Sequence, residues 1–294
     1  MLRRLMVFLL LAGAAALLAG SSAVRLGMEE GLTLCLHSVL PSLFPFFVLS
    51  SLLLSLGFAE SIGRLLFPMM NSLFHLGGNG AGALALGFIA GYPGGARAVS
   101  QLYTDGLCGK EEAEHLLAFC NNCGPAFFLS FLGAERFGST PIGLRLWLIH
   151  VLSALCTGII LRPRRTLSKD APPPKAQPIG FVAAFTQAVQ SGFSSFLGIC
   201  GFILLFSVLL QPVKSRFCQF AGFFELFSGI SFLDGSSRSL LLASVLTAWG
   251  GLSVHAQSAA FFSAAGLSGR WYLRGKLLQA VLSTLLTALW LLLP

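Results

Sequence analysis

Charged side chains are scarce in this sequence. Lys and Arg together number 19 and Asp and Glu 11 in 294 residues, which is 10%, whereas soluble domains carry about a quarter charged residues. Hydrophobic residues make up 55% and the mean hydropathy is +0.81. So few charges cannot cover the surface of a soluble globule, and apolar runs recur from end to end. The composition therefore predicts a polytopic membrane protein.

Acids are scarcer than bases, which gives a formal net charge of +8 at pH 7. The bases gather in loops between apolar runs, as in Arg162–Arg165. Loops rich in Lys and Arg stay on the cytoplasmic side of a membrane, so the charge indicates membrane topology rather than affinity for nucleic acid. We expect a multi-pass protein of the cell membrane, surrounded by the lipid bilayer and without a nucleic-acid partner.

Spacings that close disulfides, bind metals or catalyse reactions are missing. The seven cysteines are odd in number and show no repeated ligand spacing, which excludes a disulfide scaffold and a soluble metalloenzyme. Cys120 and Cys123 form a single C-x-x-C pair inside an apolar segment, which we interpret as structural. No Ser/His/Asp arrangement or phosphate-binding loop occurs. We therefore expect no enzyme activity, no cofactor and no metal site, and an energy source that is a gradient or a partner.

Several apolar runs in the first half are long enough to cross a hydrocarbon core of about 30 Å. Residues 1–28, with a positive flank, predict an N-terminal membrane anchor helix, the alternative being a cleaved signal peptide. Further spans are predicted at 32–58, 114–133 and 141–161. Residues 61–76 are shorter and more polar, which favours an amphipathic helix in the membrane interface.

Two of the apolar runs contain helix breakers. The run over 81–104 is interrupted by Gly91–Gly95, which holds one proline and three glycines. A continuous helix through this pentapeptide is disfavoured, so we predict two half-helices that fold back as a re-entrant hairpin. Asn121–Pro125 interrupts the span over 114–133 and predicts a partly broken transmembrane helix.

A basic, proline-rich segment over 162–178 is predicted to be a cytoplasmic linker between two halves. The second half repeats the order of features in the first. It has a long span at 181–210, a mixed stretch at 217–233, a glycine-broken apolar run at 240–265 and a final span at 271–293.

An offset of 160 positions aligns Gly91 with Gly251 and a Gly-Leu-x-Gly-basic turn in both halves. We therefore predict an all-α polytopic membrane protein of two inverted repeats, 29–161 and 179–294. Each repeat holds a re-entrant helical hairpin, at 81–104 and 240–265, and a partly broken transmembrane helix. Paired broken helices at corresponding positions of two halves indicate the binding site of a transporter.

One group of bases disagrees with the inverted arrangement. If 240–265 returns to the side from which it entered, Arg270, Arg274 and Lys276 lie outside the cell. This contradicts the tendency of basic residues to stay inside.

Four motifs carry a family resemblance, and they are Pro41–Phe47, Gly91–Ala96, Lys110–Glu114 and Leu117–Asn122. In these motifs the chain resembles the YlbJ-type sporulation integral membrane proteins of the nucleoside-recognition (Gate) domain group. The resemblance extends over residues 30–290. It implies that the two inverted repeats are Gate-like and that the scaffold is similar to that of concentrative nucleoside transporters. It also implies movement of dipicolinate, a small aromatic dianion, across a membrane during spore formation.

The first candidate site is the break itself, with Tyr92, Gly94, Gly95 and Arg97. Glycines let backbone N–H groups approach a ligand, and the second half-helix directs its positive end at the tip. Arg97 adds a full charge and a planar fork that suits a carboxylate. The alternative is that Arg97 pairs structurally, for example with Glu225.

Further candidates lie at the other breaks. Asn121 and Asn122 can bond a polar ligand or satisfy the backbone groups freed by the break. His255 and Gln257 occupy the second break, where a histidine can donate to a carboxylate, carry a proton or bond a neighbouring carbonyl. Glu225 is a candidate for coupling to a cation or for an ion pair, the alternative being a solvated acid in the interface.

The predicted function is an integral membrane transporter or facilitator of a small anionic or heteroaromatic solute, dipicolinate-like, that acts in spore formation. One alternative is a non-transporting membrane protein that assembles as a homo-oligomer or with other membrane proteins. Another is a permease similar to nucleoside transporters.

Overall fold

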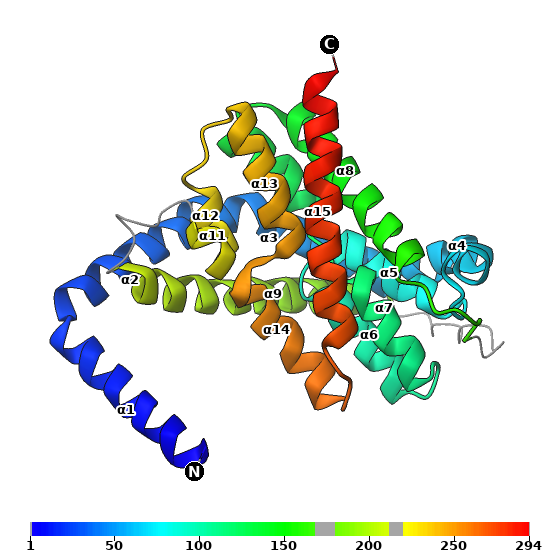
Figure 1. Ribbon diagram of the computed structural model, residues 1–294, viewed down its shortest axis with the longest axis horizontal. Coiled ribbons are helices and arrows are strands. Elements are labelled where there is room, and N and C mark those ends of the chain that lie inside the picture. Colours follow the sequence, from blue (N-terminus) through cyan, green and yellow to red (C-terminus); the bar gives the residue numbers. More distant parts are fainter. Residues whose placement is uncertain (1, 168–179, 212–219, 294) are drawn as a thin grey trace.

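The computed structural model describes residues 2–167, 180–211 and 220–293, and this part of the chain is helical and contains no strand (Figure 1). The predicted all-α class is confirmed. Within these residues, five helical runs are long and apolar enough to cross a membrane: Ser21–Leu53, Thr140–Ile160, Phe181–Leu210, Ser237–Ala264 and Arg270–Leu292. The protein is a multi-pass integral membrane protein.

The first half is a chain of short and long helices with two π-helical segments, η1 and η2. In order they are α1 (Leu2–Ala19), α2 (Ser21–Leu34), η1 (Cys35–Val39), α3 (Leu40–Ser55), α4 (Phe58–Phe74), α5 (Gly80–Ala90), α6 (Gly94–Thr104), α7 (Lys110–Cys120), η2 (Phe127–Arg136) and α8 (Thr140–Ile160). α2, η1 and α3 form one continuous run. It begins at Ser21, so the span predicted to start at residue 32 starts earlier, inside the predicted anchor segment.

The sequence over 81–104 forms two half-helices. α5 and α6 have 11 residues each, or about 16 Å at 1.5 Å per residue, which is too short for a core of about 30 Å. They pack against each other on either side of the turn at Gly91–Pro93. Gly91 has φ +75°, a value that favours glycine. This is the arrangement that the helix breakers predicted.

The predicted span over 114–133 is also broken. α7 ends at Cys120, an extended segment follows, and π-helical η2 begins at Phe127. The non-helical residues are Asn121–Gly124, and Pro125 begins the next helical turn, so the break lies where the sequence indicated.

The second half has one very long helix and two further breaks. Its helices are α9 (Phe181–Leu210), α11 (Ala221–Phe224), α12 (Leu226–Ile230), α13 (Ser237–Trp249), α14 (Gly251–Ala264) and α15 (Arg270–Leu292). α11 and α12 are separated at Glu225, and α13 and α14 at Gly250.

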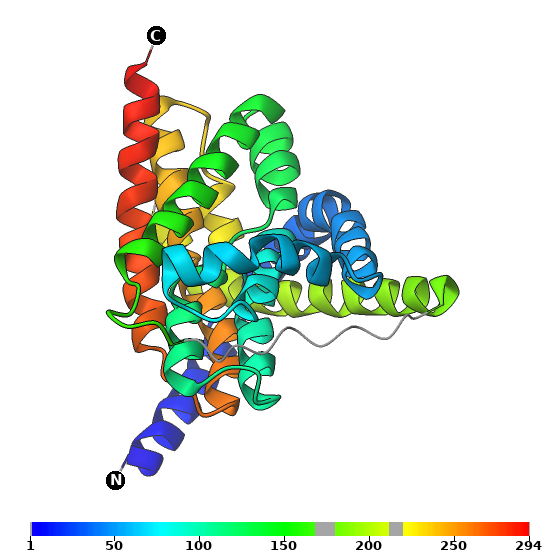
Figure 2. The same cartoon turned by 90° about the vertical axis from the view of Figure 1, so that its right-hand side faces the viewer.

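The hairpin predicted over 240–265 is wrong. α13 and α14 follow one another in the same general direction and do not fold back (Figures 1 and 2). Together they make a run of 28 residues that is long enough to span the membrane. Gly250 and Gly251 have φ +93° and +76°, and this pair of left-handed residues displaces the helix axis without reversing the chain. The two halves therefore differ at this point, and the inverted repeat remains a hypothesis.

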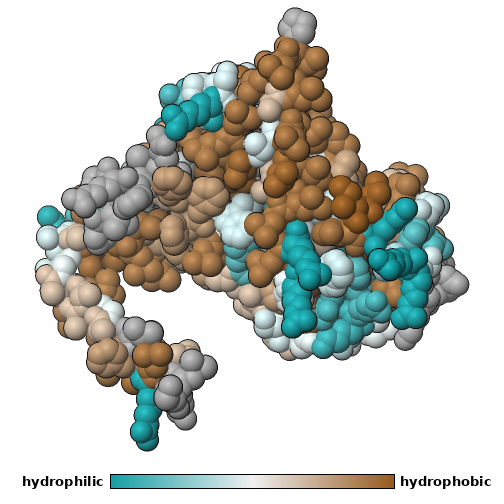
Figure 3. All heavy atoms as spheres, in the orientation of Figure 1, coloured by the Kyte–Doolittle hydropathy of each residue, from teal (hydrophilic) through white to brown (hydrophobic). Residues whose placement is uncertain are grey.

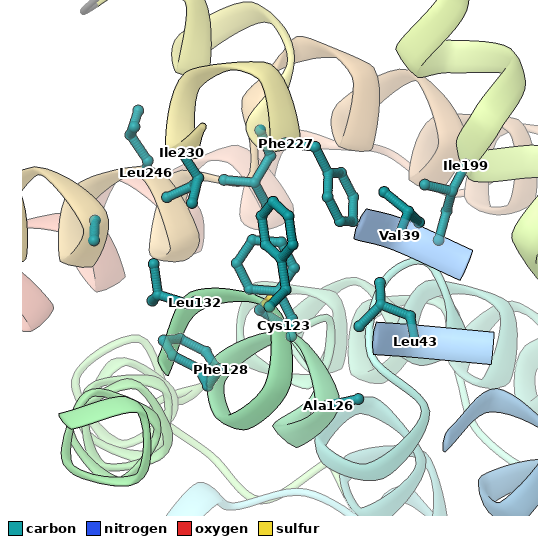
Figure 4. Packing of buried hydrophobic residues seen from close by; sticks show 14 of the residues in the cluster. Val39, Leu43, Cys123, Ala126, Phe128, Leu132, Ile199, Phe227, Ile230 and Leu246 are labelled. Carbon is teal, nitrogen blue, oxygen red and sulfur yellow. The ribbon is translucent and has the colours of Figure 1, made fainter. Parts of the chain in front are cut away.

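The long helices form two groups. α8, α13 and α15 stand side by side, while α2, α3 and α9 form a second group that runs across them (Figures 1 and 2). Between the groups lies a hydrophobic core, part of which Figure 4 shows. There Leu43 of α3 and Ile199 of α9 pack near Phe227 of α12, whose ring centre lies 5.0 Å from that of Phe127. The helix breaks adjoin this core.

Hydrophilic side chains gather around α6, α7 and the start of α15, at the lower right of Figure 3. Arg165, at the start of the predicted linker, forms an ion pair with Glu111 at 3.7 Å. The turn before α15 reaches the same end of α7, where the backbone N–H of Ser268 donates to Glu114 at 2.9 Å. Arg270 thus lies on the same face as the linker. Its predicted position on the opposite face is wrong because 240–265 is a span, and the conflict with the basic-inside tendency disappears.

The first residues of the predicted linker are hydrogen-bonded to His75, which follows α4. The N–H of Leu167 donates to the carbonyl of His75 at 2.9 Å, and His75 Nδ1 lies 2.9 Å from the carbonyl of Pro163. The remainder, 168–178, lies outside the described residues.

Candidate functional site

A small cavity opens where the helix breaks meet. Its volume is about 50 Å³. Each of four breaks or helix starts contributes to the wall: Gly91 and Tyr92 between α5 and α6, Cys123 and Gly124 between α7 and η2, Glu225 and Leu226 between α11 and α12, and Ser253, Val254 and Gln257 at the start of α14. The remaining wall is mainly apolar side chains, among them Leu43, Phe47, Phe127 and Phe227. The breaks of both halves therefore share one site.

The first two breaks touch directly. A Cβ atom on Gly91 would lie 2.9 Å from the backbone nitrogen of Gly124, so only glycine allows this approach. From the same turn, the hydroxyl of Tyr92 donates to the carbonyl of Thr247 in α13 at 3.1 Å. Tyr92 thus links the tip of the first half to the broken span of the second.

The predicted tip residues have different surroundings. Gly95 packs against the end of α7, where an added Cβ would meet the carbonyl oxygen of Cys120 at 1.9 Å. Gly94 lies near Ala90 and does not line the cavity. Arg97 is exposed, does not line the cavity, and forms no ion pair with Glu225. Of these candidates, only Tyr92 forms part of the wall.

Asn121 and Asn122 satisfy the groups around their own break. Asn121 Oδ1 accepts from the backbone N–H of Ala96 at 3.1 Å. Asn122 Nδ2 donates to the carbonyl of Phe119 at 2.7 Å. Both residues are fully buried and neither lines the cavity. In this arrangement their side chains form hydrogen bonds with backbone groups that the helix breaks leave free, which was one of the two roles predicted for them.

Of the two candidates at the second break, one lines the cavity and the other does not. Gln257 lines the cavity. His255 is buried beside it, with Nδ1 2.8 Å from the hydroxyl of Tyr272, and its Nε2 has no partner within the described residues.

Glu225 is a buried helix cap that also lines the cavity. Its two carboxylate oxygens accept from the backbone N–H groups of Phe227 at 3.1 Å and Ser228 at 2.6 Å. These groups start α12, and a carboxylate at this position satisfies donors that have no partner in the helix.

Three residues that the sequence interpretation missed complete the polar interior. Lys276 and Gln279 lie three positions apart in α15, on one helix face, and both are fully buried. Lys276 Nζ donates to the carbonyl of Asn121 at 2.5 Å and to Gln279 Oε1 at 2.8 Å. Gln279 Nε2 donates to Asn122 Oδ1 at 2.9 Å. Placing Lys276 outside the cell with Arg270 and Arg274 was wrong, since it lies inside the predicted span over 271–293, where an ionisable residue is by default a functional candidate.

Ser253 is the third missed residue. It is buried, it lines the cavity, and its hydroxyl has no partner within the described residues. It lies in the first turn of α14, whose N-terminal cap Gly250 provides no side-chain bond. Cavity, hydroxyl and helix start together offer hydrogen-bond donors to a polar group.

No group of three or more His, Cys, Asp or Glu side chains that could hold a metal is found in the part of the chain that the structure describes. The polar groups at and behind the cavity wall are hydroxyls, amides, one carboxyl group and one amino group.

Broken helices that enclose a partly polar cavity define the class as an all-helical, multi-pass membrane protein with an internal site. Residues 36–139 match the family Gate, described as nucleoside recognition. The chain is 31% identical over 201 residues to "Sporulation integral membrane protein YlbJ" of Bacillus subtilis (strain 168). The resemblance that the sequence motifs indicated is confirmed by these two matches, and residues 36–139 are similar to a Gate domain.

That similarity covers 61% of this chain and 49% of the relative, so the chain spans about half the length of the curated relative it matches. The Gate match includes α3, both half-helices α5 and α6, and α7 with its break. No solved structure matches this chain.

Proposed function

We propose that this protein is a transporter or facilitator that carries a small anionic, heteroaromatic solute across the membrane. The observation that supports the proposal is the convergence of four helix breaks on one cavity. Where a helix stops at membrane depth, lipid cannot satisfy its freed N–H and C=O groups. Such breaks persist where they face protein, water or a solute, and in transporters they surround the substrate.

The composition of the wall suits a flat ring with a polar edge. Phe47, Phe127 and Phe227 supply aromatic surface, and small-molecule sites combine such surface with a few placed polar groups. Ser253 and Gln257 supply the hydrogen-bonding groups.

The cavity of about 50 Å³ has room for roughly one or two water molecules. A pyridine dicarboxylate therefore enters only when the walls separate, and the arrangement described here is a closed state. The Tyr92–Thr247 bond, at 3.1 Å, joins the two halves in this state and is the contact we expect to break on opening.

The similarity to a sporulation integral membrane protein supports a role in spore formation, where the solute is dipicolinate or a compound like it. The proposed activity is binding of the solute and its movement across the membrane, without a chemical reaction.

Uptake into proteoliposomes tests the proposal. The purified full chain is reconstituted, and entry of radiolabelled pyridine-2,6-dicarboxylate is followed against protein-free liposomes. We expect time-dependent uptake that unlabelled dicarboxylate competes. Uptake equal to that of protein-free liposomes under every ion gradient would overturn the proposal and favour the non-transporting assembly protein.

A further inference from the structure

Lys276 is the only buried Lys or Arg among the described residues, and it lies directly behind the cavity wall. Its Nζ is 5.1 Å from the centre of the Tyr92 ring and donates to the Tyr92 hydroxyl at 3.2 Å. Tyr92 lines the cavity whereas Lys276 does not. The Tyr92 side chain therefore separates the Lys276 amino group from the proposed solute site.

Within the described residues, the amino group of Lys276 has no carboxylate among its hydrogen-bond partners. Its three bonds go to the Tyr92 hydroxyl, the Asn121 carbonyl and the Gln279 amide oxygen, which are all uncharged. Burying an ammonium without a counter-charge is strongly unfavourable, and a neutral side chain would make similar bonds at lower cost. A lysine at this buried position therefore requires an explanation.

We propose that Lys276 is the specificity-determining residue that makes the site prefer a dianion over a neutral solute. This inference rests on the proposed function. Charges interact strongly through a low-dielectric interior, so the ammonium favours a carboxylate at the Tyr92 end of the cavity. When Tyr92 moves away on opening, Nζ exchanges the tyrosine hydroxyl for a carboxylate oxygen, a stronger charge-assisted bond.

Glu225 is the acid that lines the same cavity, and its charge opposes an anion. Both of its oxygens accept from N–H groups of α12, which offset part of its negative charge. The acid belongs to the α11–α12 break and the ammonium lies behind the α5–α6 turn, so we expect a carboxylate to bind beside Tyr92 and not beside Glu225.

The experiment measures binding and transport as separate quantities. Equilibrium dialysis of the full chain in detergent gives the affinities for pyridine-2,6-dicarboxylate and for the neutral pyridine-2,6-dicarboxamide. Lys276→Gln removes the charge and keeps hydrogen-bonding capacity, Lys276→Arg keeps the charge, and Arg274→Gln removes an exposed base from the same helix. The ratio of the two affinities reports charge selection and is not changed by a uniform loss of folded protein.

Charge-assisted bonds of typical strength correspond to roughly ten- to a hundred-fold in affinity. We expect Lys276→Gln to lower the dicarboxylate-to-dicarboxamide ratio by that factor, and Lys276→Arg and Arg274→Gln to keep it near the wild-type value. An unchanged ratio in Lys276→Gln would overturn the inference, even if the wild type transports the dicarboxylate. A wild type that prefers the dicarboxylate through Lys276 but moves none into proteoliposomes would overturn the transport proposal and leave this inference standing.

Discussion

The side-chain amide of Asn121 donates a hydrogen bond to the hydroxyl of Ser258 at 2.7 Å, although 137 positions separate the two residues. Asn121 belongs to the α7–η2 break and Ser258 to α14. Because Asn121 also accepts from the backbone N–H of Ala96 in α6, one side chain joins three helices from both halves. The closed arrangement of the site therefore depends on amide chemistry at this position.

Replacing Asn121 by alanine leaves two buried groups, the Ala96 N–H and the Ser258 hydroxyl, without their present partner. Each buried group left unsatisfied costs about 1–3 kcal/mol, so we expect a clear fall in the melting temperature of the detergent-solubilised protein. Asn71→Ala is the matched control, because Asn71 is exposed on α4. Equal melting temperatures of Asn121→Ala and Asn71→Ala would contradict the bonding described here.

Gly95 is predicted to be intolerant of any side chain. An added Cβ would lie 1.9 Å from the carbonyl oxygen of Cys120, so Gly95→Ala forces α6 away from the end of α7, at a cost of about 1–3 kcal/mol or more. At Gly82 in α5 nothing lies within 4 Å of the added atom. Gly82→Ala is therefore expected to leave stability unchanged or to raise it by up to about 1 kcal/mol. Thermal unfolding of the two variants side by side checks the contrast.

The cap at Glu225 gives a prediction about α12. Removing a helix N-cap typically costs about 0.5–2 kcal/mol, and Glu225→Ala removes the acceptor for the N–H groups of Phe227 and Ser228. Glu225→Asp keeps a carboxylate of a residue type that caps helices well, so it is expected to keep most of the stability. Denaturant or thermal unfolding measures both variants, and an alanine variant as stable as wild type would show that the cap is unimportant.

The topology of the second half is tested by labelling single introduced cysteines with a membrane-impermeant maleimide. Arg164→Cys and Arg270→Cys are expected to react from the cytoplasmic side, because each lies within two positions of a residue that contacts α7, Arg165 and Ser268 respectively. Arg238→Cys, at the start of the Ser237–Ala264 span, is expected to react from the opposite side. The wild type gives the background of the native cysteines. Reaction of Arg238→Cys and Arg270→Cys from the same side would contradict a span over Ser237–Ala264 and support the re-entrant hairpin over 240–265.

Backbone breaks were the most predictable part of this structure. Proline removes a helical hydrogen bond and glycine lowers helix propensity wherever they occur, so Gly91–Gly95 and Asn121–Pro125 identify the breaks without knowledge of the tertiary fold. The direction that the chain takes after a break is not determined by the local sequence. Gly250 and Gly251 look similar to the first break in sequence, yet α14 continues the course of α13, because packing against α6 and α9 holds it there.

The candidate site was less predictable because it depends on helix rotation. Gly95, Ala96, Val99 and Ser100 form the buried face of α6, which leaves Arg97 exposed on another face. Lys276 is the opposite case to Arg97. It follows the exposed bases Arg270 and Arg274 in sequence, but its own side chain is buried in the interior. Its position inside an otherwise apolar span was the signal that could have identified it.

The central claim is that the cavity at the helix breaks is the path of the solute. Ser253→Leu places a branched side chain where the wall hydroxyl faces the cavity, and Ser263→Leu places the same side chain at an exposed position of the same helix. Dicarboxylate uptake into proteoliposomes containing equal amounts of folded protein is the measurement. The account predicts that Ser263→Leu takes up the solute like wild type and that Ser253→Leu loses most of its uptake. Uptake by Ser253→Leu at the wild-type rate would contradict the account.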